Sequence, residues 1–208
     1  MAYNSWHDTK LYKSSRRSGS CFETTVVEMI KKYTNDVWRN VRIETLLTQT
    51  GTTELDVVFY SGGIVYILEL KRVRKIVGEY ARRRWTMFGW LDNVDETSEY
   101  TALNVIEQNN IHARSLLDLY FSEFKCFPAV IPVIIVPDGC EVPPGLKSEV
   151  FTVNELEDFM ISNRIPGRKD VSYRVAFLLG SPEDTVRRSD FVDRNVSGDG
   201  PTRGRRRI

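Results

Sequence analysis

Two carboxylates and a lysine lie where buried strands would otherwise hold apolar residues. Asp56 is in the run LDVVFY, and Glu69 and Lys71 are in the run ILELK. A carboxylate is costly to bury unless it is paired or binds a metal. Glu69 and Lys71 are two residues apart, so on a strand both side chains point to the same face. The pattern indicates a polar site built on apolar strands.

The two runs flank Ser-Gly-Gly at 61–63, which predicts a β-hairpin. A two-residue turn at 61–62 places Asp56 diagonal to Glu69, and a four-residue loop places it directly opposite Glu69. A three-residue loop turns Asp56 to the other face. Two of the three short turns therefore bring the carboxylates together. The alternative is an ion pair of Glu69 with Lys71 on an exposed strand face.

Converging carboxylates suit a hard divalent cation. Mg²⁺ prefers oxygen ligands and keeps several waters and substrate phosphates, and Mn²⁺ is an alternative. A neighbouring lysine is suited to hold an attacking water and to offset charge that develops on a phosphate. These residue types therefore favour phosphodiester chemistry.

The elements around the hairpin alternate between helical and strand patterns. Apolar residues three and four apart predict helices over 20–33 and 105–124, and β-branched runs predict strands over 37–47 and 130–136. A short strand at 151–153 leads into a helix over 154–161, with Asn154 as N-cap and Glu157 completing a capping box. Residues 171–179 are predicted as a last strand, and residues 85–100 as a loop or insertion. The order predicts an α/β (α+β) fold with a central mixed β-sheet flanked by helices.

Length and composition limit the class of protein. The chain has 208 residues, of which 41% are hydrophobic and 27% charged, as in globular proteins. No apolar run is long enough to cross a bilayer, and the three cysteines are widely spaced, so we expect a reduced, cytoplasmic protein without a membrane partner. One domain is predicted over 19–180, between a flexible basic arm at 1–18 and a flexible arginine-rich tail at 181–208.

Charge is distributed unevenly although the formal net charge is only +1. Residues 71–84 hold seven basic residues and one acidic residue, whereas residues 85–186 hold seven basic and sixteen acidic residues. Local basic density favours binding to a polyanion because each neutralised phosphate releases counterions. The candidate nucleic-acid contacts are Arg72, Arg74, Lys75, Arg82, Arg83 and Arg84. Trp85, Phe88 and Trp90 follow; core packing is favoured for them over base stacking.

The ordered series of motifs resembles the nuclease-related domain (NERD) family, a branch of the PD-(D/E)xK nuclease superfamily. The resemblance covers about residues 19–162 and rests on Gly19 with Glu23, Glu54-Leu55-Asp56, Glu69-Leu70-Lys71, Gly78 with Trp85, and Asn104, Gln108-Asn109 and His112. It implies a restriction-endonuclease-like core. This series is far more specific than the E-x-K motif alone.

The resemblance also implies roles for individual residues. Asp56 and Glu69 would be metal ligands, helped by the Leu70 carbonyl, and Lys71 would assist the water. Glu23 would contact the metal directly or through water, the alternative being a first-turn glutamate favoured by the helix dipole. Gln108 would orient a phosphate or water, the alternative being an ordinary polar helix residue. His112, one helical turn further on, is predicted to be a structural histidine.

These observations together predict a metal-dependent nuclease that acts on DNA more than on RNA. The rival prediction is a nucleic-acid-binding or protein-interaction module that keeps the fold without turnover, since fold and catalysis separate readily. Because no P-loop or zinc-finger motif is seen, we expect a partner protein to supply any targeting.

Overall fold

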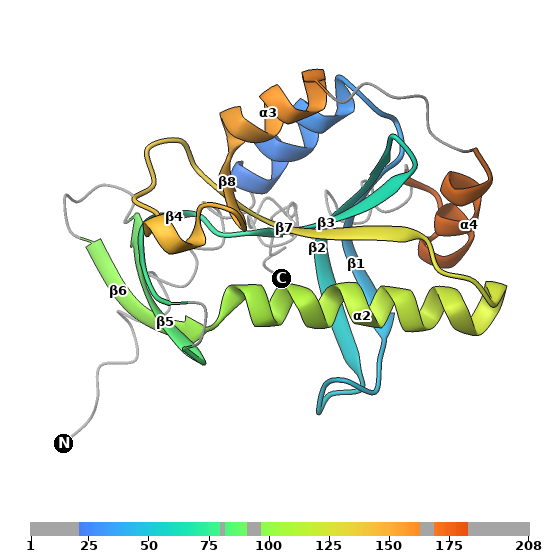
Figure 1. Cartoon of the computed structure of the whole chain (residues 1–208), viewed down its shortest axis with the longest axis horizontal. Helices are drawn as coiled ribbons and strands as arrows, with labels where there is room; N and C mark the ends of the chain where they lie inside the picture. Colours follow the sequence, from blue (N-terminus) through green and yellow to red (C-terminus); the bar gives the residue numbers. More distant parts are fainter. Residues whose placement is uncertain (1–20, 80–81, 91–96, 163–168, 183–208) are drawn as a thin grey trace, which may run out of the picture.

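A computed structural model describes residues 21–79, 82–90, 97–162 and 169–182 (Figure 1). The predicted arm at 1–18, with Gly19, and all but the first two residues of the predicted tail lie outside the described residues. The main sheet has five strands in the order β1 (Val37–Glu44), β2 (Thr52–Ser61), β3 (Ile64–Leu70), β7 (Ala129–Val136) and β8 (Val150–Thr152). No helix within the described ranges is long and apolar enough to cross a membrane.

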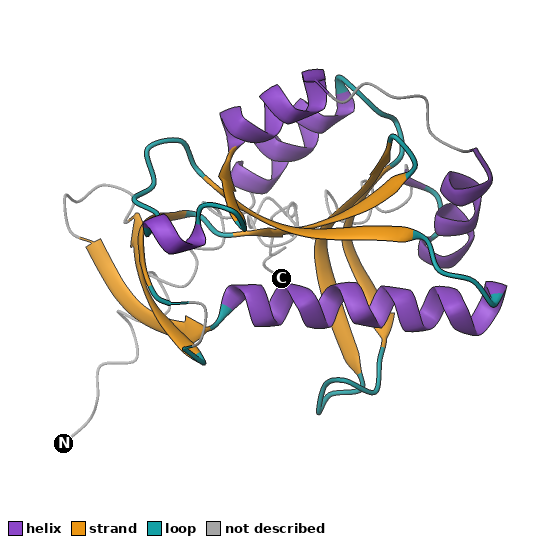
Figure 2. Ribbon diagram, in the orientation of Figure 1, coloured by secondary structure: helices purple, strands orange, loops and turns teal. Residues whose placement is uncertain are grey.

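The sheet is mixed, as predicted, and helices cover both of its faces. β1, β2 and β3 pair antiparallel, whereas β3, β7 and β8 pair parallel. The helix at residues 21–31 and α3 (Val153–Ser162) pack on one face, and α2 (Val105–Phe124) and α4 (Lys169–Leu179) pack on the other (Figure 2). The predicted α/β (α+β) class is confirmed.

The hairpin of β2 and β3 has the register that favours a shared site. Val57 pairs with Leu68 and Ser61 with Ile64, so the same register places Asp56 opposite Glu69. The loop contains only Gly62 and Gly63, because Ser61 and Ile64 on its two sides still form a pair. Both glycines have positive φ, 60° and 89°, as a type I′ turn requires. The predicted register that places Asp56 directly opposite Glu69 is therefore correct. The loop that produces it has two residues instead of the predicted four.

A second, three-stranded antiparallel sheet follows β3 directly. It consists of β4 (Val73–Val77), β5 (Arg84–Trp90) and β6 (Thr97–Leu103). The loop alternative for 85–100 is wrong for residues 85–90 and 97–100, which are in strands, with Trp85 and Met87 alternating into a buried cluster with Val73. Residues 91–96 lie outside the described residues. Trp85 is 1% exposed, which confirms a core role for this aromatic. A Cβ on Gly78 would lie 2.5 Å from the Trp85 indole, so only glycine fits beneath that ring.

Two predictions for the C-terminal part are wrong. Residues 171–179 are helical, because their apolar side chains also recur at helical spacing, and Val175 and Leu179 pack on the α2 side of the sheet. The capping box of α3 lies two residues earlier than predicted. Thr152 Oγ1 accepts from Glu155 N at 3.3 Å, and Glu155 Oε2 accepts from Thr152 N at 2.7 Å.

Helix α2 is confirmed over the predicted residues. Asn104 is its N-cap, and the Asn104 Oδ1 accepts from the backbone N–H groups of Ile106 and Glu107. Farther along, Asn109 Nδ2 donates to the carbonyls of Ile67 on β3, at 3.2 Å, and Val133 on β7, at 2.9 Å. This buried amide fixes α2 against the two central parallel strands and so sets the position of the next turn of the helix.

Candidate active site

The candidate site lies where β2 and β3 stop pairing. The last pair of the ladder is Val57 with Leu68, and Asp56 and Glu69 follow on the two strands. The backbone N–H of Leu70 donates to Asp56 Oδ2 at 2.8 Å, across the gap between the strands. This bond fixes the Asp56 carboxylate toward β3. We call the group formed by Asp56, Glu69 and Lys71 the acidic fork.

Glu69 is almost fully buried, with 1% exposure, and both of its oxygens face nitrogen atoms. Lys71 Nζ lies 2.5 Å from Oε1, and His112 Nδ1 lies 3.2 Å from Oε2. Burial alone would raise the pKa of Glu69, but the contacts with His112 and Lys71 outweigh it and lower that pKa. Glu69 is therefore held as a buried carboxylate anion.

Asp56 is partly buried and shows the opposite shift. Loss of contact with water, followed by the nearby Glu69 charge, raises the pKa of Asp56 to about 8. The Leu70 N–H and Lys71 oppose this rise, and Glu23 adds to it. Ionisation of Asp56 beside the buried Glu69 anion is therefore costly, and a divalent cation bound at the fork would remove that cost.

The donor set fits a hard cation. Glu69 Oε2 is buried and makes no well-aligned hydrogen bond, so an oxygen ligand is available there. Among the described residues, no three His, Cys, Asp or Glu side chains form a group that could hold a metal. A cation at the fork would therefore have two carboxylates, with backbone carbonyl and water completing its shell. That pattern suits Mg²⁺ or Mn²⁺ better than zinc.

Glu23 approaches the fork from the helix at 21–31, and the structure pairs it with an unexpected residue. Arg39 Nε on β1 lies 2.5 Å from Glu23 Oε1, and Arg39 is only 3% exposed. The influence of Glu23 on the pKa of Asp56 places its charge close to the fork. Sequence reasoning missed Arg39, although an arginine within the apolar strand VWRNV was the available signal.

Helix α2 contributes His112 to the fork. Its Nδ1 approaches Glu69 Oε2 at ion-pair distance without a well-aligned hydrogen bond, and the structural role predicted for it stays a prediction. Gln108, one turn earlier, is partly buried, and its side chain makes no hydrogen bond or ion pair with the described residues. The structure therefore brings Asp56, Glu69, Lys71 and His112 together, with Glu23 nearby, and leaves Gln108 without a contact to the carboxylates.

The predicted basic contacts do not form one uniform surface. Lys75 on β4 pairs with Glu141 at 2.7 Å, and Arg82 pairs with Glu79 at 3.3 Å. Arg72 is partly buried, whereas Arg74, Arg83 and Arg84 are exposed. Exposed ion pairs are weak, so pairing does not prevent phosphate contacts. Lys75 and Arg82 nevertheless differ from Arg83 and Arg84, which have no ion-pair partner among the described residues.

The fold and the fork together are consistent with a nuclease domain. The family comparison is specific: the family model of the nuclease-related domain matches residues 18–137, more than half of the chain. The chain therefore belongs to the nuclease-related domain family. The match ends after β7, so β8, α3 and α4 lie beyond it. The comparisons with curated proteins and with solved structures gave no match.

Proposed function

We propose that the chain is a metal-dependent nuclease that hydrolyses phosphodiester bonds, with DNA preferred to RNA. The observation that carries the proposal is the acidic fork. Two carboxylates converge where β2 and β3 separate, and Lys71 Nζ lies 2.5 Å from one of them. Membership of the nuclease-related domain family supports the same reaction class. The preference for DNA is carried over from the family resemblance.

In this proposal Asp56, Glu69 and the Leu70 carbonyl hold Mg²⁺ or Mn²⁺. The bound ion supplies positive charge for a phosphate oxygen and makes a bound water more acidic. The residues of the chain do the positioning. The Leu70 N–H orients Asp56, His112 orients Glu69, and Lys71 holds the attacking water in line and offsets charge on the phosphate.

Glu23 and Gln108 have secondary roles in the proposal. Glu23, fixed by the buried Arg39, adds negative charge beside Asp56 and so favours cation binding, directly or through water. Gln108 orients a phosphate or water as substrate enters, from its place one turn before His112. The basic residues Arg72, Arg74, Lys75, Arg82, Arg83 and Arg84 provide contacts to the nucleic-acid backbone.

The test is cleavage of labelled single-stranded DNA, duplex DNA and RNA by purified protein in Mg²⁺, Mn²⁺ or EDTA. We expect metal-dependent cleavage that is lost in Asp56→Asn and Lys71→Ala. The matched control is Glu54→Gln, which removes an exposed carboxylate from the same strand, two residues from Asp56. Circular dichroism confirms that each variant is folded. Full activity in folded Asp56→Asn protein would refute the proposal.

The alternative is a nucleic-acid-binding or protein-interaction module on the nuclease fold. One observation favours it: Lys71 and His112 already face both oxygens of Glu69, so this carboxylate has partners without a cation. The same experiment separates the two functions. A folded protein that binds nucleic acid but cleaves none of the substrates in either metal would be the binding module.

A further inference from the structure

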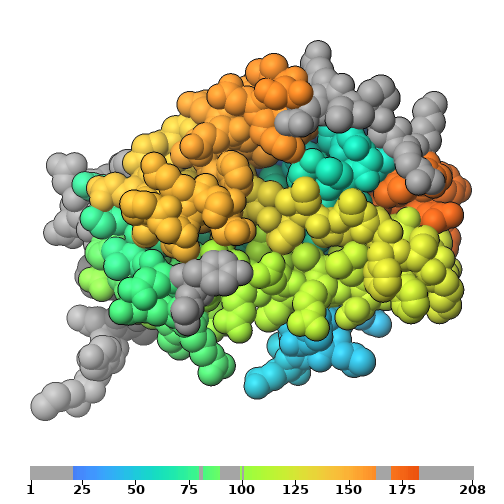
Figure 3. Space-filling model, in the orientation of Figure 1, coloured from blue at the N-terminus to red at the C-terminus, as the bar shows by residue number. Residues whose placement is uncertain are grey.

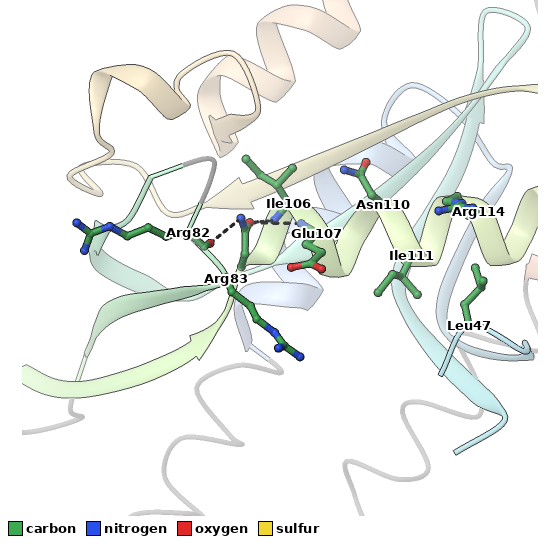
Figure 4. A pocket seen from close by; sticks show the side chains of 9 residues that line it. Leu47, Arg82, Arg83, Ile106, Glu107, Asn110, Ile111 and Arg114 are labelled. Carbon is green, nitrogen blue, oxygen red and sulfur yellow. Dashed lines mark hydrogen bonds between the residues drawn. The ribbon is translucent and has the colours of Figure 1, made fainter. Parts of the chain in front are cut away.

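A hollow of about 680 Å³ lies on the solvent side of the first half of α2 (Figure 4). It is bounded by the β1–β2 connection on one side and by the segment before β5 on the other. Figure 3 shows these two parts of the surface protruding below the helix. The volume is in the range of small-molecule sites and is sufficient for a nucleotide. The residues that matter most for its chemistry are Leu47, Arg83, Ile106, Glu107, Ile111 and Arg114.

The hollow is separate from the acidic fork. Glu107, Asn110 and Arg114 are exposed and lie on one face of α2. Asn109 and His112 are buried on the opposite face, where they contact the sheet and Glu69. A molecule in the hollow therefore meets the helix from the side away from the carboxylates.

The lining combines cations with apolar surface. Arg83 and Arg114 are exposed and make no ion pair with any described residue. Arg82 differs, because it pairs with Glu79 and points away from the helix in Figure 4. Ile106, Ile111 and Leu47 supply apolar contacts. Two cations beside apolar side chains suit a ligand with a phosphate and an unpaired base or sugar.

We propose that this hollow binds one nucleotide of a single-stranded nucleic acid, as a second contact on the face of α2 opposite the acidic fork. The inference rests on the proposed function, because it assigns a further site for the same substrate. Duplex nucleic acid binds less well, since its bases are stacked and cannot reach the apolar wall. Glu107, which also lines the hollow, weakens the attraction for phosphate.

The role of Glu107 gives the inference a sharp test. Binding of a labelled oligonucleotide is measured by fluorescence anisotropy in EDTA over a range of salt concentrations, with DNA and RNA of one sequence and the corresponding duplex. Arg83→Ala and Arg114→Ala should each weaken single-strand binding and reduce the slope of log K against log salt by roughly 0.7. Glu107→Gln should strengthen binding. Lys147→Ala removes an exposed cation outside the hollow and should change neither value.

The outcomes distinguish this inference from the proposed function. If an Arg83→Ala/Arg114→Ala double variant keeps wild-type affinity and salt slope, or if Glu107→Gln does not bind more tightly, the hollow is not a binding site. Metal-dependent cleavage by the same variants would leave the nuclease proposal standing. Conversely, if the arginine and Glu107 variants shift binding as expected but no cleavage occurs in any metal, the hollow stands and the nuclease fails.

Discussion

The two sides of helix α2 treat charge in opposite ways. On the sheet side, His112 contacts the buried Glu69, whose other oxygen is held by Lys71. On the solvent side, Arg83 and Arg114 line the hollow without ion pairs to described residues. A buried charge needs a partner that offsets its loss of hydration, whereas an exposed charge is solvated by water and needs no partner in the protein. Under the two proposals, the fork carries out the chemistry and the hollow adds affinity for the nucleic acid.

The largest expected effect is on the fork. Asp56→Asn keeps the shape of the side chain but removes a ligand charge, so we expect cleavage to fall by roughly 10²–10³-fold or more. Binding to single-stranded DNA in EDTA should change little, because the hollow is untouched. The two assays on one preparation therefore separate chemistry from affinity. An equal loss in both assays would mean that the fork also dominates binding.

The same substitution should stabilise the protein in EDTA. The folded-state pKa of Asp56 is about 8, above its ordinary value of 3.8, so folding favours the protonated acid. Between about pH 4 and about pH 8, the folded protein keeps the Asp56 proton and the unfolded chain releases it. The free energy of unfolding therefore falls as pH rises through this interval. Thermal unfolding in EDTA at pH 8 should show a higher Tm for Asp56→Asn than for wild type. At pH 3 the difference should disappear.

The second effect concerns the buried pair beside the fork. Arg39→Met leaves the Glu23 carboxylate, which is 16% exposed, without its 2.5 Å partner. We expect a loss of about 3 kcal/mol in the free energy of unfolding, measured with urea. A double variant with Glu23→Gln should recover part of it, because the carboxylate that Arg39 neutralises is then absent. Arg42→Met, an exposed position on the same strand, is the control and should cost far less.

The third effect tests the support of the hollow. Gly78→Ala places a methyl group against the Trp85 indole, whose N–H donates to the Glu79 carbonyl at 3.0 Å. We expect a loss of about 1–3 kcal/mol from overpacking. Because Arg83 follows this segment, single-strand binding should fall more than cleavage chemistry does. Gly145→Ala meets no neighbouring atom and should be neutral. Equal stability of the two variants would contradict the packing argument.

Sequence reasoning reached the fork because its signals are local. Asp56 and Glu69 interrupt apolar strands. In a hairpin, the turn sets the pairing register, and side chains two residues apart share a face, so the residues that face each other follow from the sequence. Arg39 also interrupts an apolar strand, but its partner Glu23 lies on another element, so no local pattern predicts the pair. The hollow was missed for the same reason, since Leu47, Arg83 and Arg114 are brought together only by tertiary structure.

The errors in the fold have a similar origin. Residues 171–179 have β-branched and aromatic side chains, but their packing on the α2 side of the sheet selects the helix. Residues 85–90 have no clear period in the sequence, yet they lie in β5 because β4 and β6 pair with this strand on its two sides. Local preference is weak, and tertiary partners decide both cases.

The smallest expected effect extends the comparison of buried and exposed groups to the thiols. Burial, followed by the Glu141 charge, raises the pKa of Cys140 to about 11, whereas Cys21 and Cys126 are exposed. Because the thiolate is the reactive form, Cys140 should be alkylated by iodoacetamide more slowly than Cys21 at pH 8. Mass spectrometry of timed samples gives the order, and denatured protein, in which all three thiols react alike, is the control. Faster reaction of Cys140 in the folded protein would show that the loop after β7 exposes its thiol.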